Sequence, residues 1–152
     1  MFDGVTAFLS RIREKGGRYL FLTNNSSKGV EGYIEKLNGM GIATGREDYL
    51  TSVDAAIDLL RRRYPGRRCY VQGTRSFYDQ LAAAGIPVTC DREDGAEILL
   101  SGFDRELTFQ KLEDACILLN RGVPFVATNP DWVCPMPHDE VLPDCGSICA
   151  LL

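Results

Sequence analysis

The chain has 152 residues, of which 45% are hydrophobic, so it is long enough to bury the core of one ordinary domain or of two small ones. Its net charge of −4 at pH 7 gives no overall attraction to nucleic acid or to an anionic membrane, and neither is expected as a partner. No run of about 18 apolar residues is present and Met1-Phe2-Asp3 does not begin a signal peptide, so we expect a cytoplasmic protein.

The first part of the chain shows helical and strand patterns in turn. Hydrophobic periodicity predicts, in chain order, a helix at 5–15, a strand at 18–23, a helix at 30–40, a strand at 48–52 and a helix at 55–64. We expect Ser27 and Asp54 to cap the second and third helices, because short polar side chains accept hydrogen bonds from the amides of a first helical turn. The sequence YPGRR, residues 64–68, predicts a turn and a boundary between two units.

The second part repeats the alternation. The predicted elements are strands at 69–73, 87–90, 96–103 and 124–130 and helices at 75–85 and 108–122. Continuous apolar strands separated by amphipathic helices indicate a parallel sheet covered on both faces. The predicted fold class is therefore α/β, in two units that span 1–64 and 65–152.

The end of the chain is predicted to be less regular. ATNPDWVCP, residues 127–135, opens a long proline-rich loop, and loops of such length are often functional. Ser147 is expected as the N-cap of an apolar helix, since no His and acid pair accompanies it that would make it a nucleophile.

The six cysteines do not form a metal-binding or disulfide pattern. Three of them, Cys69, Cys90 and Cys116, occur within apolar patterns and are expected to be small core residues. The other three have no CxxC pair and a single histidine nearby, and they are Cys134, Cys145 and Cys149. We therefore expect reduced thiols in a reducing compartment.

Polar residues follow two of the predicted strands, and in open α/β sheets ligands bind beyond the carboxyl ends of the strands. The segment 23–27, TNNSS, combines a hydroxyl, free backbone amides and a helix start, which suits an oxyanion such as phosphate. The same residues equally suit a plain turn and helix cap. The second strand end contributes Thr128, Asn129 and Asp131.

The chain resembles the haloacid dehalogenase (HAD) superfamily of phosphohydrolases in six stretches, which occur in the family's order and with nearly the family's spacing. They are GVTAFLSRIREKGGRYLFLTNNSS, YLTSVDAA, YVQGT, SGFDRELTFQKL, PFVATNPDWVCP and LPDCGSICALL. The resemblance is to the branch of NagD-like and p-nitrophenylphosphatase-like enzymes (subclass IIA). It implies a partial Rossmann-like core with two strands and their helices at 1–64, and an α/β cap domain at 65–152 that is incomplete at its C-terminal end.

The resemblance also implies a mechanism. In this family an Asp after the first core strand attacks the phosphoryl group, a second Asp two residues later is the general acid and base, and Mg²⁺ neutralises charge. The catalytic hydroxyl of the next strand falls on Thr23, which would bind the transferring phosphoryl group. Asn24 would add its backbone amide to the phosphate site, and Asn25 would shape the loop.

The cap loop of the family touches the leaving group of the substrate, a role that would fall here on Asp131, Trp132 and His138. Each has a plainer interpretation: Asp131 as a turn residue, Trp132 as a packed side chain and His138 as a solvated one. The substrate class implied is a small phosphorylated metabolite. Cap-mediated dimers in the family make a homodimer a possible assembly.

One stretch, MFDGV, partly matches the Asp-x-Asp-Gly nucleophile motif, with Met1 in the place of the attacking Asp. Asp3 is better interpreted as a helix-start residue. The phosphate-binding Lys and the ligands of Mg²⁺ are likewise not expected in this chain. We therefore expect an internal piece of a phosphatase, inactive alone and with an unpaired strand edge.

Two other functions stay open. A non-catalytic binding or regulatory protein would keep the cap without the chemistry. A Rossmann-type nucleotide-binding domain ranks below it, because no GxGxxG follows a predicted strand.

Overall fold

The computed structural model describes residues 2–152. The first elements are α1 (Val5–Glu14), β1 (Phe21–Thr23), α2 (Val30–Gly39), η1 (Arg46–Asp48), β2 (Tyr49–Thr51) and α3 (Ser52–Arg63). The later ones are β3 (Cys69–Gln72), α4 (Arg75–Ala83), β4 (Val88–Thr89), β5 (Ile98–Ser101), α5 (Phe109–Asn120), β6 (Phe125–Ala127), β7 (Val133–Pro135), η2 (Pro137–Asp139), β8 (Val141–Pro143) and α6 (Cys145–Leu151).

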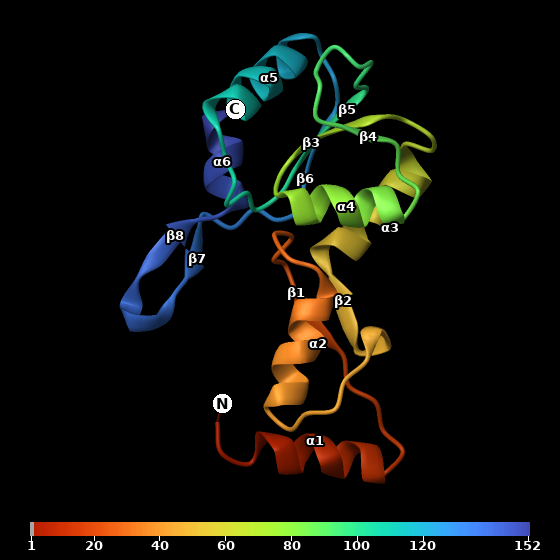
Figure 1. Ribbon diagram of the computed structural model, residues 1–152, viewed down its shortest axis with the longest axis vertical. Coiled ribbons are helices and arrows are strands. Elements are labelled where there is room, and N and C mark those ends of the chain that lie inside the picture. Colours follow the sequence, from red (N-terminus) through yellow and green to blue (C-terminus); the bar gives the residue numbers. More distant parts are fainter. Residues whose placement is uncertain (1) are drawn as a thin grey trace.

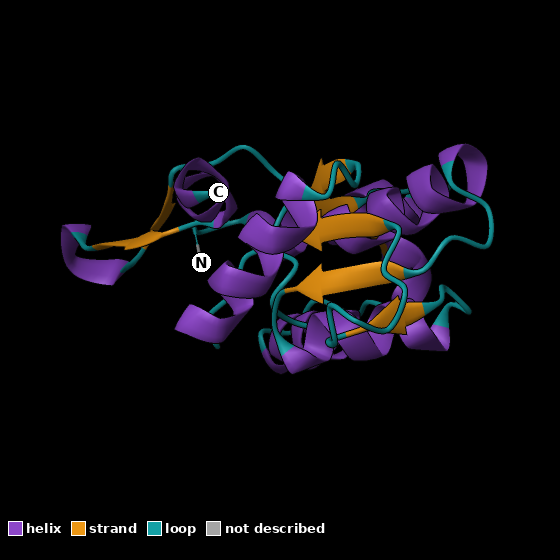
Figure 2. Cartoon of the chain, turned by 90° about the horizontal axis from the view of Figure 1, so that it is seen from above, coloured by secondary structure: helices purple, strands orange, loops and turns teal. Residues whose placement is uncertain are grey.

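The strands form three sheets. Strands β1 and β2 pair in parallel, and a four-stranded parallel sheet has the order β4-β3-β5-β6. Strands β7 and β8 form an antiparallel hairpin that projects from the body of the molecule (Figures 1 and 2). The predicted α/β class with parallel sheets is confirmed.

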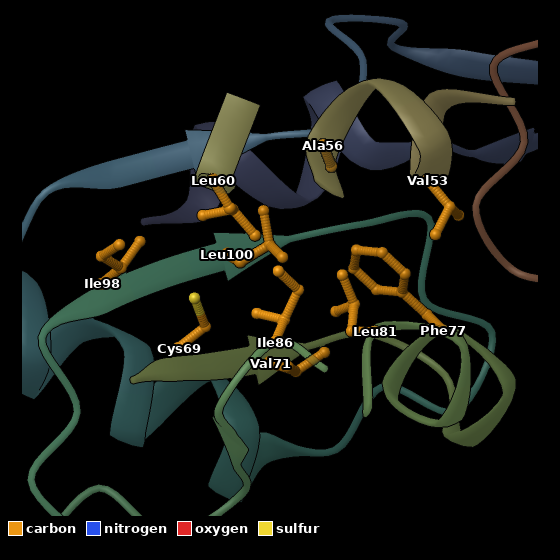
Figure 3. Packing of buried hydrophobic residues seen from close by; sticks show 10 residues of the cluster. All are labelled: Val53, Ala56, Leu60, Cys69, Val71, Phe77, Leu81, Ile86, Ile98 and Leu100. Atoms are coloured by element: carbon orange, nitrogen blue, oxygen red, sulfur yellow. The ribbon is translucent and has the colours of Figure 1, made fainter. Parts of the chain in front are cut away.

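The main core lies on one face of the four-stranded sheet. Side chains of α3 and α4 pack there against alternate residues of β3 and β5, as Figure 3 shows. The cluster consists of Val53, Ala56, Leu60, Cys69, Val71, Phe77, Leu81, Ile86, Ile98 and Leu100. Because side chains alternate along a strand, Tyr70 and Leu99 point to the opposite face, where they meet α5. Helices therefore cover both faces of this sheet, as predicted.

Helix α3 joins the two sheets. Its residues Val53, Ala56 and Leu60 are 5% exposed or less, and they belong to the core of the four-stranded sheet. The strand before it, β2, belongs to the two-stranded sheet. The expected division at residue 64 stays a prediction, and the packing of α3 crosses it.

The two-stranded sheet is covered on one face. Tyr49 stacks near Phe21 and Tyr33, with ring centroids 5.4 and 6.3 Å apart, so α2 packs on that face. Leu22 and Leu50, which are paired in register on the other face, are 71% and 46% exposed. The strand predicted at 18–23 is thus shorter than expected, and it is not buried on both sides.

Three predicted helix caps are wrong. The amide and hydroxyl of Ser27 both donate to Oδ1 of Asn25, and α2 begins later, after Gly29. Asp54 occupies the third position of α3 and completes a capping box with Thr51, the actual N-cap. Helix α6 begins at Cys145 with Asp144 as its N-cap, so Ser147 lies inside the helix.

Two further expectations change. Asp3 lies in the turn before α1, whose N-cap is Gly4 with a left-handed φ of 80°, and Met1 lies outside the described residues. The loop predicted from residue 127 contains the β7–β8 hairpin, in which Pro135 pairs with Val141 on the two sides of η2. None of the helices in residues 2–152 is long and apolar enough to cross a bilayer.

The structure describes the six cysteines as free thiols. Cys69 is fully buried, as expected of a core residue, and Cys116 is half-buried. Cys90 is exposed, because β4 ends one residue before it at the edge of the sheet. The prediction that Cys90 is a core residue is therefore wrong.

Candidate functional site

Thr23 ends strand β1 directly beside Thr51, the last residue of β2. A cleft of about 530 Å³ opens at these strand ends. Its lining consists of Leu22, Thr23, Asn24, Leu50, Thr51, Ser52, Ala55 and Thr128. Ligands of parallel sheets bind at this end of the strands, so the position of Thr23 fits the prediction from the sequence.

The hydroxyl of Thr23 is available to donate a hydrogen bond. Its oxygen accepts the amide hydrogen of Asn25 at 3.3 Å, which leaves the hydroxyl proton to a ligand. The neighbouring hydroxyl of Thr51 is already used, since it donates to Oδ2 of Asp54 at 2.9 Å in the cap of α3. Of the two threonines at the strand ends, Thr23 is therefore the one suited to bind an oxyanion.

The loop after Thr23 is held by its own side chains. Oδ1 of Asn25 accepts the amide of Ser27 at 2.8 Å and the hydroxyl of Ser27 at 2.7 Å, which closes an Asx-turn. The carbonyl oxygen of Asn24 accepts the hydroxyl of Ser52 at 2.7 Å. These bonds fix the path of the backbone where the sequence predicted a phosphate loop.

The same loop docks on the carboxyl ends of the four-stranded sheet. Ser26 is fully buried, and its oxygen accepts the amide of Phe103, after β5, at 2.9 Å. It also lies 3.2 Å from Oγ1 of Thr128, after β6. Thr74, the N-cap of α4, donates its hydroxyl to the carbonyl of Ser27 at 3.1 Å. The two parallel sheets thus meet through their strand ends, with the TNNSS segment between them (Figure 1).

The structure brings Asp131 to the predicted phosphate loop. The side-chain amide of Asn24 donates to Oδ2 of Asp131, although the two residues are 107 positions apart. Asn129 supports both partners, because its Nδ2 donates to the Asn24 carbonyl at 3.1 Å and its Oδ1 accepts the Asp131 amide at 2.9 Å. Two strand ends that the sequence identified separately therefore form one site.

Trp132 and His138 lie elsewhere. The Trp132 side chain is 66% exposed and lines a second, more apolar groove with Phe125 and Cys149, so it is not a packed core residue. His138 is exposed and lies in η2, between the two strands of the projecting hairpin (Figure 1). Neither residue lines the cleft at Thr23, and their predicted contact with a leaving group stays a prediction.

The cleft is electrically neutral over its described lining. Hydroxyl, amide and aliphatic groups form its walls, and none of the lining side chains is charged. Within residues 2–152 there is no group of three or more His, Cys, Asp or Glu side chains that could hold a metal ion. Mg²⁺ prefers carboxylate oxygens, so the residues described here do not supply a site that fits it.

Sequence reasoning missed the residues that position the loop. Ser26 looked like one more turn residue, and Ser52 and Asn129 were not assigned partners. Their contacts span 28 to 105 positions of sequence, and no local pattern specifies such pairs. The available signal was their polarity next to predicted strand ends, where buried hydroxyls and amides need partners.

The chain is similar over nearly its whole length to proteins that are named as phosphatases. The chain is 31% identical over 150 residues to an acid sugar phosphatase of Staphylococcus aureus, which covers 99% of this chain and 57% of that protein. It is 34% identical to the solved structure of 4-nitrophenylphosphatase from Thermotoga maritima, with a TM-score of 0.90 over 99% of this chain and 57% of that one.

A third relative is a glycerol phosphate phosphatase from Mycobacterium tuberculosis, solved in complex with magnesium. It is 30% identical, with a TM-score of 0.88, and the match covers 99% of this chain and 45% of that one. The chain thus spans about half the length of these relatives. A sequence model of the family described as haloacid dehalogenase-like hydrolase matches residues 1–87, more than half of the chain. The chain belongs to the haloacid dehalogenase-like hydrolase family.

Proposed function

We propose that these residues form the phosphate-binding wall and the substrate-covering part of a phosphatase that hydrolyses phosphomonoesters of small metabolites. The observation that carries the proposal is the free hydroxyl proton of Thr23 at the mouth of the cleft, beside a loop fixed by Asn25. A phosphoryl transition state spreads negative charge over its outer oxygens, and fixed hydrogen-bond donors stabilise that charge.

In this proposal each residue of the loop has a distinct role. Thr23 donates its hydroxyl to the transferring phosphoryl group, and the backbone amide of Asn24 adds a second donor. Asn25 positions both, because its side chain closes the turn that follows them. Asp131 reaches the same loop through Asn24, which supports the proposed contact of Asp131 with the leaving group.

In this proposal the residues that line the cleft supply neither the attacking carboxylate nor the Mg²⁺ site. Other residues supply both. The described lining holds no carboxylate, and Asp3, in the turn before α1, is not part of it. A phosphate group at Thr23 would therefore be bound by this chain but not attacked by it. We infer that the 152 residues alone do not hydrolyse phosphate esters.

A turnover assay with p-nitrophenyl phosphate and Mg²⁺ tests this inference. The wild-type chain and Thr23→Ala should give the same background rate. Turnover by the wild type that Thr23→Ala abolishes and Thr23→Ser retains would show that the chain has its own nucleophile.

The neutral lining of the cleft also favours a second candidate, a non-catalytic protein that binds phosphorylated metabolites. The DNA on both sides of the coding segment separates the two. An upstream Asp-x-Asp-Gly in the same frame supports the phosphatase, and in that longer protein Thr23→Ala should lower kcat/KM by about 100-fold. A frame without the motif supports the binding protein. A homodimer and a cytoplasmic location remain proposals alongside either function.

A further inference from the structure

Two thiols touch each other in helix α6. The sulfur atoms of Cys145 and Cys149 are 3.8 Å apart, one helical turn from each other. The Cα atoms of such a pair are separated by about 6 Å in an α-helix, inside the range that a disulfide bond spans. Cys145 is moreover the first residue of the helix, where the backbone has more freedom to adjust than in a central turn.

The two thiols differ in how solvent reaches them. Cys145 is fully buried, and its sulfur lies 3.6 Å from the carbonyl oxygen of Ser101 and 3.8 Å from the hydroxyl of Thr128. Cys149 is half-buried and lines the open groove of about 540 Å³ that Trp132 also borders. A small oxidant in the groove therefore meets Cys149 first, with Cys145 directly behind it.

The contact also polarises the pair. Either sulfur can be the donor in this contact, which lowers the pKa of Cys145 below its ordinary value of 9.0, helped by hydrogen bonds from Asn129 and Thr128. The same bond, together with burial, raises the pKa of Cys149. Cys145 is therefore the sulfur that can take up the proton of Cys149 when Cys149 reacts.

We propose that Cys145 and Cys149 form an oxidation site that closes to a disulfide with hydrogen peroxide as the oxidant. This is a property of α6 and does not rest on the proposed phosphatase function. The nucleophilic sulfur is that of Cys149, because it faces the groove, and the resolving sulfur is that of Cys145.

The chemistry has two steps. In the first, the Cys149 sulfur attacks one peroxide oxygen, the O–O bond breaks, and the thiol proton passes through Cys145 to the departing hydroxide, which leaves a sulfenic acid and water. In the second, the Cys145 sulfur attacks the Cys149 sulfur, the S–O bond breaks, and the hydroxide leaves with the Cys145 proton as water. The two thiols lose two electrons in total, and the peroxide is reduced to two waters.

The test is a thiol count with peptide mapping on the full 152-residue chain. After treatment with hydrogen peroxide and removal of the oxidant, the number of thiols that react in denaturant should fall from six to four. No disulfide should form between chains, the peptides of Cys145 and Cys149 should be joined by a disulfide, and dithiothreitol should restore six thiols.

Variants separate this site from general thiol oxidation. Cys149→Ser and Cys145→Ser should each prevent the loss of two thiols, whereas the control Cys116→Ser, which changes a half-buried cysteine of α5, should lose two as the wild type does. The mapping in the wild type does not depend on whether any variant folds. An unchanged count, oxidation at the exposed Cys90, linkage between chains, or sulfinic acid at Cys149 without a disulfide would each overturn the proposal.

Discussion

Replacing Ser26 by alanine tests how the TNNSS segment is held between the two sheets. The Ser26 hydroxyl is the only side-chain group that residue offers, and it bonds the Phe103 amide at 2.9 Å and the Thr128 hydroxyl at 3.2 Å. Ser26 is fully buried, so neither contact is open to solvent. The substitution removes one oxygen atom and leaves the packing otherwise unchanged.

The expected cost follows from the partner that is left behind. A buried amide without an acceptor costs about 1–3 kcal/mol, and the Thr128 hydroxyl can turn toward other partners. We therefore expect Ser26→Ala to lower the free energy of unfolding by about 2 kcal/mol. In a domain of this size that change lowers Tm by about 4–8 °C.

Urea unfolding followed by circular dichroism measures the effect. Ser10→Ala, at an exposed position of α1, is the matched control and should change the free energy of unfolding by about 0.5 kcal/mol or less. If Ser26→Ala unfolds at the same urea concentration as the control, the segment is not fastened to the four-stranded sheet through this hydroxyl.

Three further substitutions have defined outcomes. Phe77→Ala should cost about 3–5 kcal/mol in urea unfolding, because the ring is fully buried at the centre of the main core. Gly146→Ala should lower Tm, since a Cβ there would lie 2.3 Å from the carbonyl oxygen of Pro130 and would push the backbone near Asp131. Burial raises the pKa of Cys69 from 9.0 to about 11. Because this folded-state pKa is above the unfolded one, the contribution of the neutral thiol is complete below pH 9 and is lost as the pH rises toward 11. The wild type should therefore lose about 2 kcal/mol more than Cys69→Ala between pH 8 and pH 11, and parallel pH profiles would contradict this.

The sequence predicted the elements of the four-stranded sheet well because each has a strong local signal. The strand of Cys69 is apolar up to its last residue, Gln72, and helices α4 and α5 follow Thr74 and Thr108, which cap them as such residues commonly do. Glycines with left-handed φ, Gly85 and Gly122, follow both helices. Local pattern and final structure agree at every one of these positions.

Two caps were missed where a group outside the helix competed for the same side chain. Ser27 resembles an N-cap in sequence, but the Asn25 side chain binds it first. Ser147 likewise precedes an apolar run, yet its hydroxyl donates to the carbonyl of Trp132. Sequence alone shows that such a residue needs a partner, and only the fold decides which partner it finds.

The site was predicted in two halves and assembled by the fold. Thr23 ends a strand and Asp131 follows one, which sequence can recognise. Their approach through Asn24 depends on the packing of one sheet against the other, which involves contacts more than one hundred positions apart. The same holds for Trp132 and His138, which lie close to Asp131 in sequence and face other surfaces.

The central claim is that Thr23 and its loop bind phosphate. Titration of the ¹⁵N-labelled chain with inorganic phosphate, followed by amide NMR, tests it most directly. We expect saturable shifts of the Thr23, Asn24 and Asn25 amides that Thr23→Ala abolishes and Thr23→Ser retains. Shifts confined to the arginine-rich segment 61–68, at the end of α3 and in the turn after it, would contradict it, as would equal shifts in Thr23→Ala and the wild type.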